Sequence, residues 1–223
     1  MESEPAGAGR AFGDRLELAR RYVHSLSTDG VVRGLIGPRE PARLWTRHVL
    51  NSAAVAGLID PGVTVVDIGS GAGLPGVPLA IARPDLLVIL VEPLERRVRF
   101  LLEMVESLQL TNCRVIRGRA DEVVAEAGNA DVVTSRAVAP LHRLVAWSAP
   151  LIRNDGLLLA MKGSTAEEEL DRDRAAVAAE GLVDPVVVPI EDGSGGTTFV
   201  IRARRREALT RPQSRRPRKP RRQ

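Results

Sequence analysis

From Val63 onward, short apolar runs of strand length alternate with longer segments that are apolar along one helical face. Strands are expected over 63–67, 86–92, 113–117, 130–134 and 156–161, helices over 74–82, 94–110, 140–151 and 165–180, and a closing hairpin over 186–190 and 197–202. Strands that alternate with helices at this spacing form βαβ units, in which a mainly parallel sheet is covered on both faces. The alternation therefore predicts an α/β fold that binds its ligands where the strands end.

The part of the chain before Val63 has a different pattern of apolar residues, with helical spacing. Two amphipathic helical patterns, 12–26 and 41–58, precede the first expected strand, and Pro41 fits the first turn of the second one. We expect residues 1–60 to form a helical extension packed on the core, residues 61–204 to form the α/β domain, and residues 205–223 to form a basic tail.

The positive charge of the chain is concentrated in that tail. The net charge is +4, from 32 basic and 28 acidic residues, but eleven of the basic residues and only one acid lie within residues 202–223. The remainder of the chain therefore carries a net charge of −6. From Arg211 onward there is no aliphatic or aromatic side chain, which predicts disorder. Such a tail either attracts phosphate backbones or serves as a solubilising extension, and composition alone favours neither.

The composition also excludes several classes of protein. With 44% hydrophobic and 27% charged residues, a packed domain is expected and wholesale disorder is not. The single cysteine, Cys113, rules out an internal disulfide, and with three histidines it cannot build a Cys/His zinc cluster. The start of the chain lacks the apolar core of a signal peptide, and the apolar run 86–91 is far shorter than the ~20 residues of a membrane span. We expect a cytoplasmic protein with no metal site.

The strongest local motif is a glycine loop that directly follows the first expected strand. Asp67 ends the strand, and Gly69, Gly71 and Gly73 lead into the first helix. Glycines let the chain turn sharply and bring its backbone against a ligand. The stretch 71–76 also fits the GxGxxG dinucleotide pattern, so the glycines alone do not choose the cofactor. Asp67 favours S-adenosylmethionine, which carries a sulfonium and an ammonium, over a pyrophosphate that a carboxylate would repel.

Polar residues also follow the next two expected strands. Glu92 ends the second strand, where a carboxylate can accept hydrogen bonds from both ribose hydroxyls of an adenosine. Ala120 and Asp121 follow the third strand, where a backbone N–H and a carboxylate can read an adenine edge. These residues support a nucleoside cofactor without distinguishing S-adenosylmethionine from a nicotinamide dinucleotide.

Arg136 directly follows the fourth expected strand. A guanidinium there can bind a cofactor carboxylate or a substrate phosphate through two parallel hydrogen bonds, or it can stack on a guanine. An ion pair with an acid such as Asp67 is the structural alternative.

Taken together, these motifs resemble those of a known family. The resemblance rests on the stretch 67–84 (DIGSGAGLPGVPLAIARP), the arginine-rich stretch 96–101, Ser135-Arg136-Ala137 and Lys162-Gly163, and on Arg47-His48 followed by Leu50-Asn51-Ser52. Over residues 12–204 the chain is similar to the glucose-inhibited division protein B family of bacterial 16S ribosomal RNA guanine-N7 methyltransferases.

The resemblance implies a Rossmann-like class I methyltransferase with a seven-stranded, mainly parallel sheet and extra N-terminal helices. It implies S-adenosylmethionine as cofactor and the small-subunit ribosomal RNA or particle as partner, and we expect a monomer. The cofactor positions that it carries over are Gly69, Leu74, Ala120, Asp121 and Arg136, with Glu92 at the ribose position, where relatives often have Asp. Arg136 is the residue expected to act in catalysis.

Three further basic residues are expected to flank the mouth of the cofactor site. Arg96 and Arg97 open the helix after Glu92, and Lys162 ends the fifth expected strand. All three can hold RNA phosphates, and an ordinary charged helix face is the plain alternative.

Two other functions remain open at this level. The GxGxxG pattern with Glu92 also fits a nicotinamide-dependent oxidoreductase, although the sole tyrosine, Tyr22, lies in the N-terminal extension rather than at a hydride-transfer site. A non-catalytic RNA-binding protein that acts through its tail is the second alternative, in which changes at Asp67 or Arg136 would have no effect.

Overall fold

The computed structural model describes residues 2–206, and the basic tail beyond Arg206 lies outside the described residues. Its centre is one seven-stranded sheet with the strand order β3-β2-β1-β4-β5-β7-β6. The strands are β1 (Thr64–Ile68), β2 (Leu87–Glu92), β3 (Cys113–Arg117), β4 (Ala130–Arg136), β5 (Ile152–Lys162), β6 (Leu182–Glu191) and β7 (Thr197–Arg205). Strands β1 to β5 pair in parallel, whereas β7 pairs antiparallel with both β5 and β6. The predicted α/β fold with a mainly parallel sheet is confirmed.

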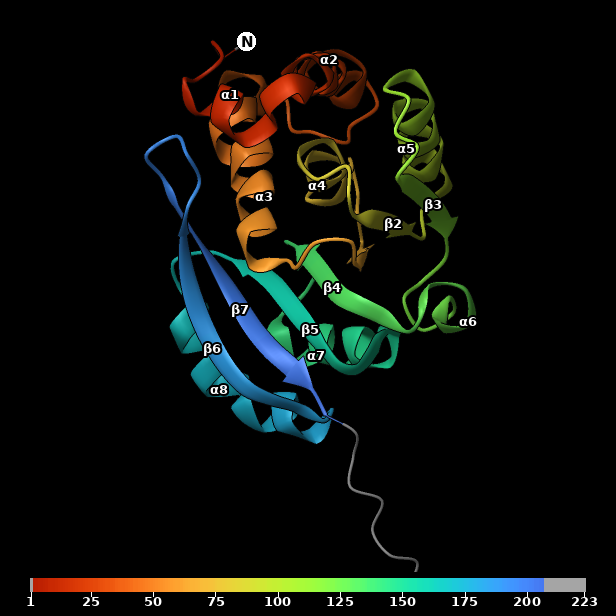
Figure 1. The fold of residues 1–223 in the computed structure, drawn as a ribbon, viewed down its shortest axis with the longest axis vertical. Coiled ribbons are helices and arrows are strands. Elements are labelled where there is room, and N and C mark those ends of the chain that lie inside the picture. The colour runs from red at the N-terminus through yellow and green to blue at the C-terminus, as the bar shows by residue number, and fades with distance from the viewer. Residues whose placement is uncertain (1, 207–223) are drawn as a thin grey trace, which may run out of the picture.

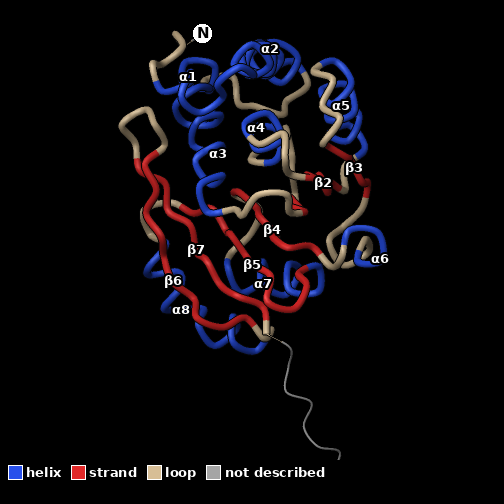
Figure 2. Tube along the Cα trace, viewed as in Figure 1, coloured by secondary structure: helices blue, strands red, loops and turns tan. Residues whose placement is uncertain are grey.

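Helices cover both faces of this sheet (Figure 1). The α-helices are α1 (Gly7–Phe12), α2 (Leu16–Ser25), α3 (Asn51–Ala53), α4 (Gly76–Ala82), α5 (Glu95–Ser107), α6 (Val124–Ala127), α7 (Leu141–Ser148) and α8 (Ala166–Ala179). Short 3-10 or π-helical segments are η1 (Gly13–Arg15), η2 (Leu26–Gly30), η3 (Glu40–Arg43), η4 (Leu44–Leu50), η5 (Ala54–Leu58) and η6 (Ala149–Leu151). Figure 2 shows α1 to α5 grouped at one end of the view, and α7 and α8 behind β5, β6 and β7.

The core is divided by the sheet into two hydrophobic clusters. Successive residues of a strand point to opposite faces, so Val65 packs with α2 to α5 on one face, whereas Val66 packs with α7 and α8 on the other. Both side chains are fully buried. This is why the central strands are almost continuously apolar, as expected for parallel strands covered on both faces.

The N-terminal helices share the first of these clusters. Tyr22 on α2 is fully buried and donates from its hydroxyl to the carbonyl of Ala72, at 2.8 Å, in the glycine loop. Arg15 donates to the carbonyl of Ala80 on α4 at 3.1 Å. The helical extension therefore contacts the loop in which the cofactor residues are expected.

The structure subdivides both helices expected before Val63. The expected helix 12–26 is interrupted at Gly13, whose φ of +50° is left-handed and lies outside the helical region. The expected helix 41–58 consists of η3, η4, α3 and η5 in succession. The expected helix 94–110 ends at Ser107, shortly before Gln109 with its φ of +52°.

Within residues 2–206, no helix is both long and apolar enough to cross a membrane. In the same residues, no three His, Cys, Asp or Glu side chains gather as potential ligands of a metal ion.

Candidate active site

A cavity of about 690 Å³ opens at the carboxyl ends of the central parallel strands. Four of the residues expected at the cofactor site line it, namely Gly69, Glu92, Ala120 and Asp121. They come from three separate βα connections, after β1, β2 and β3. Parallel strands end at the same edge of the sheet, which brings these sequence-distant residues around one cavity.

The glycine loop forms one wall of the cavity and leaves no room for a side chain at Gly69. This residue has a φ of +66°, and a Cβ there would lie 2.8 Å from Cγ2 of Val138. A glycine is therefore required both by the backbone conformation and by the close approach of Val138. Leu74, which was expected at the cofactor, is half-buried and packs against the hydrophobic cluster on the α4 side of the sheet.

Glu92 ties the glycine loop to the start of α5. It is 1% exposed, and its two carboxylate oxygens accept hydrogen bonds from the N–H of Gly71 at 2.9 Å and of Leu94 at 3.0 Å. Nη1 of Arg97 lies 3.5 Å from Oε2 of the same carboxylate. Each oxygen has a further lone pair, so the group can still accept hydrogen bonds from a ligand.

Asp67 lies beneath the glycine loop and is not one of the residues that line the cavity. Its side chain is fully buried, and Oδ2 accepts a hydrogen bond from the N–H of Gly76 at 3.0 Å. Oδ1 is buried without a hydrogen-bond partner. Burial, against which the hydrogen bond from Gly76 only partly acts, raises the pKa of this carboxyl to about 7. In this position Asp67 supports the loop at the start of α4.

Arg136 faces the N-terminal helices and is not among the residues that line the cavity. Its guanidinium donates to Oγ of Ser52 at 3.0 Å and to the carbonyls of His48 and Arg47 at 3.2 and 3.1 Å. It also lies 2.8 Å from Nδ1 of His48. No ion pair joins it to Asp67 in the described structure, so that alternative is wrong. Burial lowers the pKa of the Arg136 guanidinium.

His48 links Arg136 to Glu40 through its two ring nitrogens. Since Nδ1 accepts from Arg136, Nε2 carries the proton and donates to Oε2 of Glu40 at 2.6 Å. Burial lowers the pKa of His48, which favours this neutral form. The motif 47–52 thus supplies acceptors for Arg136, a role that the sequence pattern alone does not indicate.

The segment after Arg136 forms the far wall of the cavity. Ala137 and Val138 both line it, and Ala137 has a φ of +54°, which is unusual for a residue with a Cβ. Arg136 therefore anchors one end of a wall whose next two residues line the cavity.

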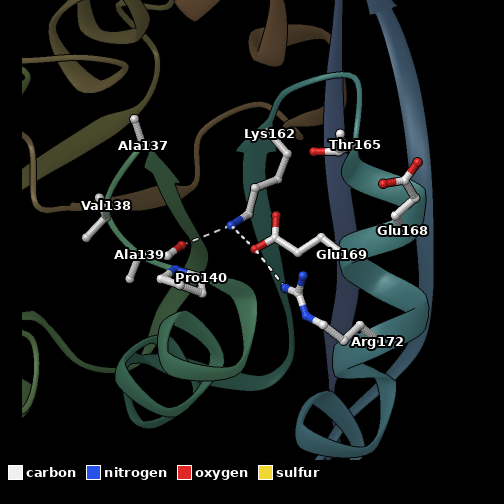
Figure 3. A pocket seen from close by; sticks show the side chains of 9 residues that line it. All are labelled: Ala137, Val138, Ala139, Pro140, Lys162, Thr165, Glu168, Glu169 and Arg172. Atoms are coloured by element: carbon white, nitrogen blue, oxygen red, sulfur yellow. Dashed lines mark hydrogen bonds and ion pairs between the residues drawn. The ribbon is translucent and has the colours of Figure 1, made fainter.

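The three expected RNA-contacting residues occupy different environments. Arg96 is exposed at the start of α5. Arg97 lines the cavity beside Glu92. Lys162 is only 11% exposed and forms an ion pair with Glu169 at 2.9 Å (Figure 3), so its ammonium already has an acid partner.

Three further residues with charged or aromatic side chains also line the cavity: Arg119, Arg143 and Trp147. Both arginines are exposed, and the Trp147 side chain is 37% exposed. Arg119 lies two residues after the end of β3 and directly precedes the expected Ala120 and Asp121, whereas Arg143 and Trp147 lie on α7, where no sequence pattern indicates a site. Cys113 does not line the cavity, and burial raises the pKa of its thiol to about 12, which disfavours the thiolate that a nucleophile requires.

Comparisons with solved structures identify the fold. The chain is similar to TYW2 of M. jannaschii in complex with AdoMet, with a TM-score of 0.56 and 21% identity over 72% of this chain and 76% of that one. It is also similar to Aeropyrum pernix fibrillarin with natively bound S-adenosyl-L-methionine, with a TM-score of 0.53 and 21% identity over 70% of this chain and 74% of that one. The expected Rossmann-like class I methyltransferase fold is confirmed.

Comparisons of sequence identify the family. The chain is 58% identical to a ribosomal RNA small subunit methyltransferase G of Rhodococcus jostii, over 91% of this chain and 90% of that protein. It is 50% identical to the protein of that name in Streptomyces avermitilis, over 89% and 90% of the two chains. The family model described as rRNA small subunit methyltransferase G matches residues 15–194. The chain therefore belongs to the rRNA small subunit methyltransferase G family.

Proposed function

We propose that the protein transfers a methyl group from S-adenosylmethionine to N7 of a guanine in 16S ribosomal RNA of the small subunit. Membership of the rRNA small subunit methyltransferase G family carries this proposal. The structural relatives bound to S-adenosylmethionine support the same cofactor. The family leaves no reason to retain the nicotinamide-dependent alternative.

The residues around the cavity fit this cofactor. Gly69 has no side chain, so a ligand can contact its backbone directly. Glu92 has lone pairs that can accept hydrogen bonds from ribose hydroxyls. Ala120 can donate its backbone N–H to an adenine edge, and the Asp121 carboxylate can accept from it. When bound, S-adenosylmethionine supplies a methyl group on a positively charged sulfur. Asp67 and Gly71 contribute by holding the loop, through the Gly76 and Glu92 contacts.

The reaction makes modest chemical demands on the protein. N7 of guanine has a free lone pair and no proton to lose, so neither a general base nor a nucleophilic side chain is required. Orientation of the two reactants can then supply much of the acceleration. We propose that Arg136 contributes as a positioning residue, since its guanidinium holds the Ala137–Val138 wall against the 47–52 segment.

Basic residues around the cavity suit the RNA. We propose that Arg96, together with Arg119 and Arg143 on the cavity rim, contacts phosphates of the substrate. We place the enzyme in the cytoplasm, where bacterial ribosomes assemble, and expect it to act as a monomer, because its own helices cover both faces of the sheet.

Radiolabel transfer tests the proposal. The protein is incubated with methyl-labelled S-adenosylmethionine and with either small or large ribosomal subunits that lack their own modifications. We expect label in small-subunit RNA and background label in large-subunit RNA. Label in neither, from protein that binds the cofactor, would contradict the assigned substrate. A parallel titration with NADH is expected to show no binding.

A further inference from the structure

A second cavity, of about 570 Å³, lies beside the cofactor cavity. One side is the segment Ala137–Pro140 after β4, and the other is formed by Lys162 at the end of β5 and the first turns of α8 (Figure 3). Ala137 and Val138 line both cavities. The two cavities therefore adjoin at these residues, and a group bound in the second lies next to the first.

Glu169 presents a carboxylate to the second cavity in a fixed orientation. Its Oε1 accepts hydrogen bonds from the N–H of Leu141 at 2.7 Å and from Nζ of Lys162 at 2.9 Å. Nη2 of Arg172 lies 3.9 Å from the same oxygen. The Glu169 side chain is 16% exposed. All these contacts end on Oε1, so Oε2 is the oxygen left for a ligand.

Lys162 also contacts the segment Ala137–Pro140 on the other side of the cavity. Its ammonium donates to the carbonyl of Ala139 at 3.0 Å as well as to Glu169, and its side chain is 11% exposed. Figure 3 shows both contacts converging on the ammonium. The sequence suggested that Lys162 contacts an RNA phosphate, but in the structure its ammonium joins the two sides of this cavity.

We propose that the second cavity takes the target guanine and that Oε2 of Glu169 accepts hydrogen bonds from its N1–H and 2-amino groups. This inference rests on the proposed function. Among the purines of RNA, guanine alone presents these two donors side by side, whereas N1 of adenine is an acceptor that a carboxylate repels. Guanine held by this edge keeps N7, on a different edge, free to face the cofactor cavity.

The same carboxylate also favours the reaction itself. During transfer, the N7 lone pair forms a bond to the methyl carbon, and the electron pair of the carbon–sulfur bond returns to sulfur. The positive charge thereby moves from the sulfonium to the guanine ring. A carboxylate next to N1–H stabilises this growing charge, and its low exposure strengthens the interaction.

Glu169→Gln tests the proposal, because the surrounding hydrogen bonds fix the orientation of the new amide. Leu141 and Lys162 both donate to the Oε1 position, which keeps the amide oxygen there and turns the NH₂ group toward the ligand. A donor then faces the donors of guanine. We expect the transfer rate to fall by roughly 10- to 100-fold, with cofactor affinity unchanged. Glu167→Gln, at an exposed neighbour outside the cavity wall, is the matched control.

Replacement of the target base separates recognition from a structural role. Once the wild-type protein has located its guanine, 2-aminopurine is placed there by RNA ligation; it keeps N7 and the 2-amino group but has an acceptor at N1. We expect the wild type and Glu167→Gln to methylate it roughly 10- to 100-fold more slowly than guanine. In Glu169→Gln this preference is expected to disappear, because the amide can donate to N1.

If Glu169→Gln slows the methylation of guanine and of 2-aminopurine by the same factor, the inference is overturned and Glu169 only supports the cavity wall. An unchanged rate on guanine would overturn it as well. Failure of the wild-type protein to form 7-methylguanosine would instead contradict the proposed function, and this inference with it.

Discussion

Arg136 and His48, 88 residues apart in the sequence, meet at 2.8 Å between a guanidinium nitrogen and Nδ1 of the imidazole. The contact joins the end of β4, where the cavity wall begins, to the helical segment that precedes the sheet. A residue that sequence reasoning placed on the cofactor thus binds the N-terminal extension. The extension is expected to set the position of the cavity wall, and not only to cover the sheet.

Arg136→Ala is expected to impair both stability and transfer. The change leaves the buried hydroxyl of Ser52 and the half-buried acceptors of His48 without their donor, which should lower the free energy of unfolding by about 2–3 kcal/mol. Without the Arg136 contacts, the Ala137–Val138 segment is no longer held in place, and this should lower the transfer rate by up to about 100-fold in protein that remains folded. Urea denaturation and initial rates measure the two effects. Arg47→Ala is the control, because Arg47 offers Arg136 only its main-chain carbonyl and its side chain is 56% exposed. A normal rate in Arg136→Ala would refute the positioning role.

Gly69→Asp is expected to abolish tight cofactor binding while leaving a folded protein. Any Cβ at this position collides with Val138, and the positive φ adds strain. We expect the Kd for S-adenosylmethionine to rise by roughly 100-fold or more, equivalent to about 2.7 kcal/mol, in a calorimetric titration. Gly57→Asp is the matched control, since that glycine is exposed, has no positive φ, and has open space around its Cβ position. Equal affinity in the two variants would remove Gly69 from the cofactor site.

Asp67→Asn is expected to change how stability depends on pH. Burial raises the pKa of this carboxyl from 3.8 to about 7 in the folded protein. Between these values the folded state holds a proton that the unfolded state has released, so the stabilisation is complete below pH 3.8 and is lost as the pH rises through 7. An amide cannot ionise. The free energy of unfolding of the wild type should therefore fall relative to the variant, by up to about 1.4 kcal/mol per pH unit in this window. A constant difference between the two proteins from pH 4 to 7 would show that Asp67 is ionised throughout.

Arg96 and Arg97 are expected to have separable effects although they are neighbours. Arg96→Ala should lower the slope of log affinity for RNA against log salt by about one, with no change in cofactor affinity, if one phosphate contact is lost. Arg97→Ala should weaken cofactor binding, because this side chain lies in the cavity beside Glu92. Arg99→Ala is the control, since Arg99 is exposed and pairs with Glu95 on the same helix. A salt slope that drops equally in Arg99→Ala would mean that Arg96 makes no specific phosphate contact.

The sequence predicted those features that depend on local pattern. Apolar runs located β1, β2, β4 and the end of β5, and the alternation of strands with helices located β3. The shared edge of a parallel sheet brought Gly69, Glu92, Ala120 and Asp121 to one cavity, as their positions at or after strand ends predicted. The helix interruption at Gly13 was missed, because an isolated glycine inside an amphipathic pattern does not reveal whether its φ is positive.

Contacts between distant segments could not be predicted in the same way. Lys162 was expected to reach RNA, but its partner Glu169 lies on the following helix, and only the packing of α8 against the end of β5 brings the two together. The Arg136–His48 contact likewise depends on how the N-terminal helices dock on the sheet. A charged residue at a strand end is thus a good indicator of a site, but its partner is fixed by tertiary structure.

Identification of the methylated nucleoside tests guanine-N7 transfer itself. Small-subunit RNA labelled by the purified protein is digested to nucleosides, which are separated and identified by mass spectrometry. We expect the label in 7-methylguanosine, and we expect it to be lost in Gly69→Asp. Label in any other nucleoside, such as one methylated on an exocyclic amine or a ribose, would contradict guanine-N7 transfer.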